Sequence, residues 1–342
     1  MIGIGVIGYG YWGPNLVRNF AELDECRVAA VCDRDAERRK RVAKRYPAVR
    51  TFAEASELIA DPDVHAVAIA TPVASHYELA LAALQAGKHV LVEKPLASSA
   101  AQCARLVEEA QTRGLVLMVD HTFLYTGAVE KIGELVRSGE LGDVLYYDSV
   151  RVNLGLFQPD VDVIWDLAVH DLSIMDAVLP AKPRAVQAAG IRHLEGQQVN
   201  MAYLTIKYDE ALIAHLHMNW LAPVKIRRTL IGGSTKMIVY DDLEPSEKIR
   251  VYDRGVSMLD RNSEDGRSVY KMLAYRRTGD MWAPKLRATE ALDLEARHFL
   301  DCVAGRAKPL TDGASGLRIV RLLEAASESL ERDGAWVELP AE

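Results

Sequence analysis

Residues 2–13 read IGIGVIGYGYWG, an apolar run that breaks into three glycines. The apolar half predicts a short strand buried on both faces, and the residues that follow predict a helix in which the early Pro14 costs no hydrogen bond. Gly8, Gly10 and Gly13 fall between them with the spacing G-x-G-x-x-G. In this pattern the first glycine permits a tight turn, the second lets a pyrophosphate approach the backbone, and the third lets helix and strand pack closely. The stretch therefore predicts the phosphate-binding turn of a dinucleotide site.

Strands and helices alternate over the first third of the chain. The expected strands are 2–7, 27–33, 64–71, 88–95 and 115–121, and the expected helices are 14–23, 36–46, 75–86 and 99–112. Such alternation implies parallel βαβ units and a doubly wound sheet. We therefore expect a Rossmann domain over residues 1–122. Asp33 ends its second strand, where an acid can accept hydrogen bonds from the adenosine ribose of a dinucleotide.

The rhythm changes after residue 122. Runs of alternating apolar and polar residues separated by turn residues occur at 143–152 and then from about residue 185 to residue 253, which is typical of an antiparallel sheet with one covered face. Helices are expected over 128–138, 289–302 and 315–332. Residues 123–342 are therefore predicted to form an α+β domain on an open, mostly antiparallel sheet. The fold class of the whole chain is α/β.

The composition argues against several classes of protein. The 342 residues carry 41 Lys and Arg against 48 Asp and Glu, and the net charge of −7 repels nucleic acids and anionic membranes. The sequence shows no apolar run of about 18 residues, and no basic residue precedes Arg18, so neither a membrane span nor a secretion signal is predicted. Four cysteines without a C-x-x-C pair predict no disulfide framework and no zinc site, and they fit the cytoplasm. His215 and His217 alternate on one strand, but no third ligand is indicated, so no metal is expected.

The choice between NAD and NADP stays open at the level of sequence. Asp33 would repel the 2′-phosphate of NADP, which favours NAD. Arg34, Arg38 and Arg39 stand nearby and could pair with that phosphate. A solvated basic helix face explains the same arginines without any ligand, and we favour that interpretation.

Three segments together resemble one family. They are GVIGYGYWGPN at 5–15, the stretch 66–97 that contains VEKPLA, and WDLAVHD at 165–171. The combination is similar to the glucose-fructose oxidoreductase, inositol dehydrogenase and MocA family (Gfo/Idh/MocA), and the similarity extends to the final helices. Within that family, residues 151–175 and 275–286 resemble the branch that acts on nucleotide-linked sugars. That branch includes 3-dehydrogenases of UDP-N-acetylglucosaminuronate and 3-ketoreductases of deoxysugar pathways.

Lys94 is the first candidate catalytic residue. Glu93, Lys94 and Pro95 stand at the carboxyl end of a predicted parallel strand, where open α/β sheets place their ligands. Pro95 keeps Lys94 out of the helical region and admits a cis bond. The family resemblance implies that Lys94 contacts both the substrate hydroxyl and the nicotinamide ribose, and it places Glu93 at the cofactor as well. A cation there would stabilise the alkoxide-like oxygen during hydride transfer.

Asp166 and His170 are the other catalytic candidates. Their i, i+4 spacing puts both side chains on one face of a helix. Histidine titrates near neutral pH and suits proton exchange with a carbinol oxygen, and the carboxylate can hold substrate or stabilise imidazolium. An isolated D-x-x-x-H is more often a surface ion pair, so the assignment depends on Lys94 and the resemblance. Asp171 is given no role.

Other candidates carry less specific signals. Tyr11 and Trp12 in the glycine turn, with Arg34, are assigned to the cofactor site, as are Thr71, Pro72 and His76, for which helix capping explains the pattern equally well. His121, Arg151 and Asn153 are candidate substrate contacts, although a strand-edge role explains Arg151 and Asn153 equally well. Many relatives carry an asparagine-arginine pair where this chain has Thr122 and Phe123, which puts a transferred sugar contact at His121 in doubt.

These residues predict an NAD(P)-dependent oxidoreductase that interconverts a secondary alcohol and a ketone on a sugar. We expect a nucleotide-linked sugar and reaction at C3. The alternatives are a dehydrogenase of a free polyol or aldose such as inositol, and a non-catalytic NAD(P)-binding sensor of the same fold. Because relatives pair through the open sheet, a homodimer or homotetramer is expected.

Overall fold

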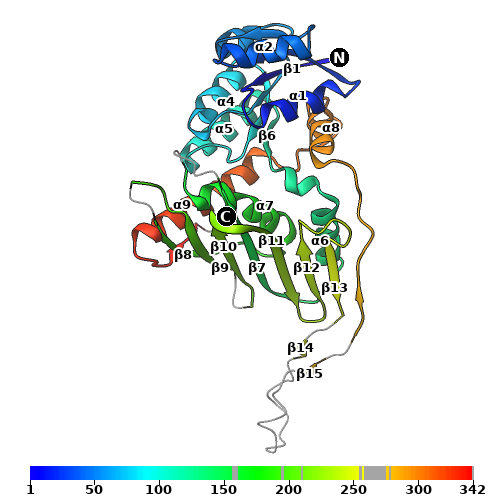
Figure 1. Ribbon diagram of the computed structural model, residues 1–342, viewed down its shortest axis with the longest axis vertical. Coiled ribbons are helices and arrows are strands. Elements are labelled where there is room, and N and C mark those ends of the chain that lie inside the picture. The colour runs from blue at the N-terminus through cyan, green and yellow to red at the C-terminus, as the bar shows by residue number, and fades with distance from the viewer. Residues whose placement is uncertain are drawn as a thin grey trace, which may run out of the picture. The chain divides into compact units, whose positions relative to one another are not determined.

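The computed structural model describes residues 1–155, 161–193, 196–208, 211–253, 256–257, 275–276 and 279–340. The chain divides into two compact units (Figure 1). Unit 1 consists of Met1–Thr126 and Thr289–Glu324, and unit 2 of Gly127–Ala288 and Ala325–Glu342. Parts of the two segments that resemble the nucleotide-sugar branch, residues 156–160 and 277–278, lie outside the described residues.

Unit 1 is built on a six-stranded parallel sheet with the order β3-β2-β1-β4-β5-β6. Its strands are β1 (Ile2–Ile7), β2 (Cys26–Cys32), β3 (Arg50–Phe52), β4 (Ala66–Ile69), β5 (His89–Glu93) and β6 (Leu117–Asp120). Its α-helices include α1 (Gly13–Ala21), α2 (Ala36–Arg45), α3 (Ala55–Ala60), α4 (His76–Gln85), α5 (Ala100–Arg113) and α8 (Ala291–Val303). The strand order reverses between β1 and β4, and such a switch point opens a ligand crevice at the carboxyl ends of the strands. The predicted Rossmann fold is confirmed.

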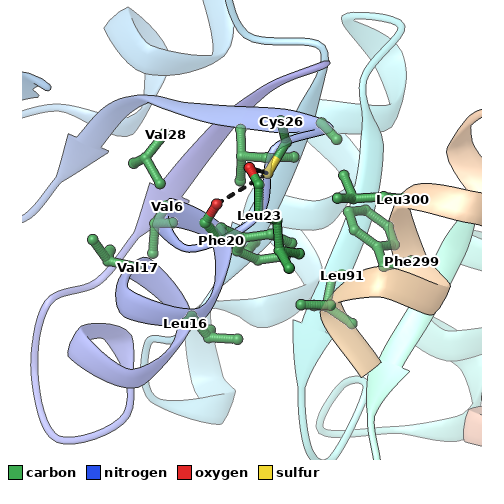
Figure 2. Packing of buried hydrophobic residues seen from close by; sticks show 14 of the residues in the cluster. Val6, Leu16, Val17, Phe20, Leu23, Cys26, Val28, Leu91, Phe299 and Leu300 are labelled. Carbon is green, nitrogen blue, oxygen red and sulfur yellow. Dashed lines mark hydrogen bonds between the residues drawn. The ribbon is translucent and has the colours of Figure 1, made fainter. Parts of the chain in front are cut away.

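The late helix α8 belongs to unit 1. Phe20 of α1 meets Phe299 of α8 edge to face, with ring centroids 6.3 Å apart, and Leu300 lies in the same buried cluster (Figure 2). The Cys26 thiol donates to the carbonyl of Phe20 at 3.1 Å and ties β2 to this cluster. The division into units therefore differs from the single boundary expected at residue 122. The reason is that the apolar stripe of α8 is buried against α1, which joins a distant part of the sequence to the first unit.

A short strand and a short α-helix of unit 1 were not expected from the sequence. The strand β3 has three residues and the helix α3 has six, so neither is long enough for its period to stand out. The carbonyl of Phe52 in β3 accepts from the N–H of Asp33 at 3.2 Å. This short strand therefore helps to fix the end of β2, where the expected ribose contact lies.

Unit 2 is built on a nine-stranded sheet with the order β16-β13-β12-β11-β7-β10-β9-β8-β17. The strands are β7 (Val144–Leu154), β8 (Ala185–Ile191), β9 (Met201–Lys207), β10 (Ile213–Asn219), β11 (Leu221–Gly233), β12 (Met237–Asp241), β13 (Ile249–Tyr252), β16 (Met281–Trp282) and β17 (Val337–Glu338), and β14 (Val256–Ser257) pairs separately with β15 (Tyr275–Arg276). Every pair in the large sheet is antiparallel except β7 with β10. The mostly antiparallel sheet predicted for this region is confirmed.

The remaining helices are α6 (Gly127–Arg137), a π-helical turn η3 (Ile164–Ala168) that continues into α7 (Val169–Val178), and α9 (Gly313–Glu331). Residues that alternate along β9 and β10, such as Leu204 and Leu216, are fully buried, while Tyr203 and Ile213 between them are exposed. One face of this part of the sheet is therefore covered and the other is open. Among the described residues no helix is both long and apolar enough to cross a membrane.

Candidate active site

The three glycines of the dinucleotide turn meet different surroundings. A Cβ on Gly8 would lie 2.4 Å from the carbonyl oxygen of Ala70, and its φ of +96° favours glycine as well. A Cβ on Gly13 would lie 2.0 Å from the carbonyl oxygen of Gly8. A Cβ on Gly10 would meet only the tip of Arg38, at 3.5 Å. The packing of the chain thus accounts for Gly8 and Gly13, whereas the open space over Gly10 fits a ligand that approaches the backbone.

The helix α1 starts directly behind this turn, with Trp12 at its N-cap position. Because tryptophan has no side-chain oxygen, it cannot accept from the first N–H groups of the helix, which can bind an anion instead. Tyr11 is 92% exposed, and the Trp12 side chain is partly buried. The turn and the helix end therefore fit the pyrophosphate of a dinucleotide.

Donors from three directions hold the carboxylate of Asp33, which is itself buried. Its Oδ2 accepts from the N–H of Tyr9 at 2.7 Å and from Arg38 Nη1 at 3.4 Å, and its Oδ1 accepts from the N–H of Asp35 at 2.8 Å. Arg39 Nη1 donates to the carbonyls of Asp33 and Arg34, at 2.7 and 2.9 Å. Of the three arginines near this carboxylate, Arg39 thus binds backbone carbonyls, Arg38 faces the Asp33 side chain, and Arg34 is exposed.

His76 connects the segments that follow β4 and β5. Its ring is 1% exposed, with Nδ1 2.8 Å from the carbonyl oxygen of Pro95 and Nε2 2.7 Å from that of Thr71. The Thr71 hydroxyl accepts from Ser75 Oγ at 2.8 Å, and Pro72 is largely exposed next to it. The imidazole therefore fixes two strand ends at the edge where Lys94 lies.

Lys94 directly follows β5, and its peptide bond to Pro95 is cis. Its N–H donates to Glu93 Oε2 at 3.0 Å. Burial, followed by the charge of Asp120, raises the pKa of Glu93 well above its ordinary value, although Lys94 opposes the rise. Burial and the same Asp120 also raise the pKa of Glu295, on α8, well above its ordinary value. Lys94 thus directly follows one of two buried carboxyls whose pKa values are raised.

Sequence reasoning did not single out Asp120 or Glu295. Asp120 ends β6, as Glu93 ends β5, and Glu295 lies on the buried face of α8 near Leu292 and Phe299. A carboxylate within an apolar helical stripe is unusual, and that position was the available signal. His121, beside Asp120, is 2% exposed.

In unit 2, the two catalytic candidates lie on either side of a change in helix type. Asp166 belongs to the π-helical turn and His170 to α7, so the i, i+4 geometry expected for a regular helix is altered here. Asp166 Oδ2 accepts from Trp220 Nε1 at 3.1 Å. His170 is partly exposed. Single π-helical turns occur frequently at functional sites, which agrees with the position of this pair.

Arg151 and Asp171 form a buried ion pair. Arg151 is 4% exposed and Asp171 is 2% exposed, and Arg151 Nε donates to Asp171 Oδ2 at 2.7 Å. Ser149 Oγ donates to the same carboxylate at 2.8 Å. The structure therefore gives Asp171 a packing partner and places Arg151 in the interior of unit 2, while Asn153, further along β7, is partly exposed.

The structure thus collects most of the expected cofactor residues at the carboxyl edge of one parallel sheet, where they define a dinucleotide-binding protein. Residues 2–121 match the oxidoreductase family Gfo/Idh/MocA with an NAD-binding Rossmann fold, and residues 129–239 match the C-terminal domain of the same family. The chain belongs to the Gfo/Idh/MocA family and is an NAD-binding oxidoreductase. In the described part of the chain, no group of three or more His, Cys, Asp and Glu residues could hold a metal ion.

Several relatives share most of the chain. It is 29% identical over 319 residues to the UDP-N-acetylglucosamine 3-dehydrogenase of Acidithiobacillus ferrooxidans, with 92% of this chain and 93% of the relative covered. It is 36% identical over 239 residues to an inositol 2-dehydrogenase of Saccharopolyspora erythraea, with 67% and 70% covered. The solved structure of the Acidithiobacillus enzyme aligns with a TM-score of 0.80 and 26% identity, covering 97% of this chain and 98% of that one.

Proposed function

We propose that this protein uses NAD to interconvert a secondary alcohol and a ketone at C3 of a nucleotide-linked sugar. The observation that carries the proposal is the position of Lys94, at the carboxyl end of β5, on the sheet edge that also carries the dinucleotide turn. The similarity to a UDP-N-acetylglucosamine 3-dehydrogenase over 92% of the chain supports the substrate class. The buried carboxylate of Asp33 favours NAD, with NADP the second choice.

In the proposed reaction His170, Lys94 and Asp166 have distinct roles. His170 accepts the proton of the substrate hydroxyl, a task suited to an imidazole near neutral pH. The Lys94 ammonium stabilises negative charge on the same oxygen as the carbonyl forms. Asp166, whose carboxylate is held by Trp220, orients the substrate or stabilises the imidazolium of His170. Bound NAD supplies the nicotinamide ring that accepts hydride.

The cofactor side of the proposal includes the glycine turn with Tyr11 and Trp12, Asp33 with Arg34, and Thr71, Pro72, His76 and Glu93. His121 and Asn153 are proposed to line the substrate side. Arg151 is proposed to act there through its buried pair with Asp171, which holds β7 in place, rather than through a charge offered to solvent.

Turnover of defined substrates tests the proposal. Purified protein is supplied with NAD and, in turn, a UDP-sugar, a dTDP-sugar, inositol and glucose, and the absorbance of reduced nicotinamide is followed. We expect turnover with a nucleotide-linked sugar. The 36% identity to an inositol dehydrogenase makes inositol the specific rival, and turnover of inositol alone would transfer the function to free polyols. Binding of NAD without turnover of any of these compounds favours a sensor.

Two variants test the residue roles. Lys94→Ala is expected to lower kcat by about 10²- to 10³-fold and His170→Ala by about 10²- to 10⁴-fold, with NAD still bound. Lys308→Ala, which removes an exposed lysine of unit 1, is the matched control and should keep the wild-type rate. Near-normal rates in both site variants would contradict the assigned roles.

Self-association and location are the remaining parts of the proposal. The open sheet face carries exposed Tyr203 and Ile213, and Tyr203 stacks on His217 with centroids 4.4 Å apart. Copies of the chain are proposed to pair through this face, so Ile213→Glu should lower the molar mass measured in solution. All four cysteines are free and buried, which supports the reducing environment of the cytoplasm.

A further inference from the structure

One hydrogen bond crosses the ligand edge of the sheet in unit 1. Trp12 leaves the glycine turn after β1, and its Nε1 donates to Asp120 Oδ2 at 2.7 Å, at the end of β6. The strands β4 and β5 lie between β1 and β6 in the sheet. A side chain of the dinucleotide turn is therefore held by a carboxylate three strands away, on the far side of the strand that leads to Lys94.

Asp120 also connects to two other carboxyls. It is 2% exposed, it accepts from the Thr122 hydroxyl at its Oδ1, it lies opposite Glu93 where β5 pairs with β6, and its charge acts on both Glu93 and Glu295. Like charges this close favour a proton on one of the carboxyls. Glu93 in turn accepts from the N–H of Lys94 at 3.0 Å. An unbroken chain of contacts thus runs from Trp12 through Asp120 and Glu93 to Lys94.

Other groups also face these carboxyls from the neighbouring elements. Lys94 opposes the rise in the pKa of Glu93, and Glu295, Cys302 and Asp120 all act electrostatically on Tyr125. His121 is buried beside Asp120. Lys94 contributes a positive charge beside Glu93, and burial next to Asp120 favours a proton on Glu93, which limits the negative charge of the group. Such an arrangement is costly for folding, because unlike a buried ion pair it brings like charges together.

We propose that Asp120 is a positioning residue of the oxidoreductase: it fixes Trp12 in the dinucleotide turn and, from its place opposite Glu93 on the neighbouring strand, sets the charge beside Lys94. The inference rests on the proposed role of Lys94. Folding alone does not call for the carboxylate, because a neutral amide could accept from Trp12 and leave no like charges in the interior. The charge is useful where it adjoins a cation that must keep its proton during the reaction.

The test compares conservative variants of the full chain. Asp120→Leu removes the acceptor, and Trp12→Phe removes the donor. Each is expected to raise the dissociation constant of NAD by about tenfold, the usual loss for a hydrogen bond to a charged group. The double variant should bind NAD no more weakly than the weaker of these two single variants, because both substitutions remove the same contact. Asp120→Asn keeps an acceptor for Trp12 and removes only the charge, so its dissociation constant for NAD should stay closer to that of wild type. Glu109→Gln is the control, since Glu109 is also buried but pairs with Arg105 and Arg113 on α5.

The pH profile separates positioning from simple support of the fold. In Asp120→Asn, Glu93 loses its like-charged neighbour and ionises next to Lys94, so the ammonium is held more tightly and the alkaline limb of kcat should move to higher pH. If Asp120→Asn does not fold, Trp12→Phe still reports the NAD contact and Glu295→Gln still reports the shift of the limb. NAD affinities within twofold of wild type in Asp120→Leu and Trp12→Phe, additive effects in their double variant, or an unmoved pH profile in Asp120→Asn would each overturn the proposal. A wild-type chain that binds NAD but oxidises no sugar would refute the proposed function. The dissociation constants of NAD for the Trp12 and Asp120 variants would still decide whether Asp120 positions Trp12.

Discussion

The two units bury charge in opposite ways. In unit 2, Arg151 and Asp171 are of opposite sign, and their mutual contacts account for the presence of both. In unit 1, Glu93, Asp120 and Glu295 are of the same sign, and the packing of the chain alone does not account for them. A buried pair that compensates itself belongs to the scaffold. Buried carboxyls that repel one another are not explained by the stability of the fold, so they point to a ligand or a reaction.

The largest expected effect breaks the compensated pair. Arg151→Met leaves Asp171 charged and 2% exposed with no cation in that pair, so the free energy of unfolding should fall by about 3–5 kcal/mol. Denaturant unfolding followed by tryptophan fluorescence measures the loss. The double variant Arg151→Met with Asp171→Leu removes both charges and should recover most of it. A single variant as stable as wild type would show that the pair is not part of the scaffold.

A second comparison uses two glycines of the same turn. Gly13→Ala drives a Cβ to 2.0 Å from the Gly8 carbonyl oxygen and should cost about 1–3 kcal/mol of stability. Gly10→Ala meets only the Arg38 tip at 3.5 Å and should change stability by less than about 0.5 kcal/mol while weakening NAD binding. Thermal unfolding and NAD titration measured together distinguish the two roles. Equal losses of stability would contradict the assignment of Gly10 to the ligand.

The glycine example also shows how far sequence reasoning reaches. The spacing G-x-G-x-x-G and the acid at Asp33 predict the Rossmann unit because they encode local geometry. The attachment of α8 to that unit depends on a contact between Phe20 and Phe299, which are far apart in the chain, and no local pattern encodes it. The partner of Arg151 was hidden for the same reason, since Asp171 looked like one more acid on a helix.

The residues of the candidate site likewise fall into those that a local sequence pattern predicts and those that depend on contacts with distant elements. Lys94 and its neighbours could be placed because the carboxyl end of a parallel strand is a fixed location in the fold. Asp120 could not, because its importance comes from what Trp12 and Glu295 bring to it from two other elements. The π-helical turn at Asp166 was likewise not predicted, because the i, i+4 spacing is typical of a regular helix.

The uncompensated carboxyls predict a pH dependence of stability. Burial raises the pKa of Glu295 and of Glu93, so the folded chain keeps protons that the unfolded chain has released. Unfolding then releases protons, and stability should fall as the pH rises from the ordinary carboxyl range through the raised pKa values. Each retained proton contributes a slope of about 1.4 kcal/mol per pH unit.

Glu295→Gln should flatten this slope, because an amide has no proton to lose. Unfolding of both forms between about pH 5 and pH 9 checks the expectation, with Glu109→Gln as the control that keeps the wild-type slope. The carboxyl of Glu109 is paired with arginines, so it has no reason to retain a proton when folded. Parallel curves for wild type and Glu295→Gln would show that this carboxyl is ionised in the folded chain.

The smallest expected effect lies at the partly exposed edge of unit 1, where opposite charges meet as they do in unit 2 but in contact with water. Arg38 faces the carboxylate of Asp33 at 3.4 Å, and its side chain is 41% exposed. By offsetting part of the negative charge of Asp33, it should soften the repulsion of a 2′-phosphate.

Arg38→Ala is therefore expected to leave kcat/KM with NAD nearly unchanged and to lower kcat/KM with NADP about fivefold, which corresponds to about 1 kcal/mol for a solvated pair. Lys40→Ala is the control on the same helix, since Lys40 pairs with Glu37 rather than with Asp33 and its loss should affect neither cofactor. The ratio of the two rates is the measurement. If Arg38→Ala instead improved NADP use, Arg38 would obstruct the ribose rather than offset Asp33, and the three donors that hold the Asp33 carboxylate would by themselves determine the preference for NAD.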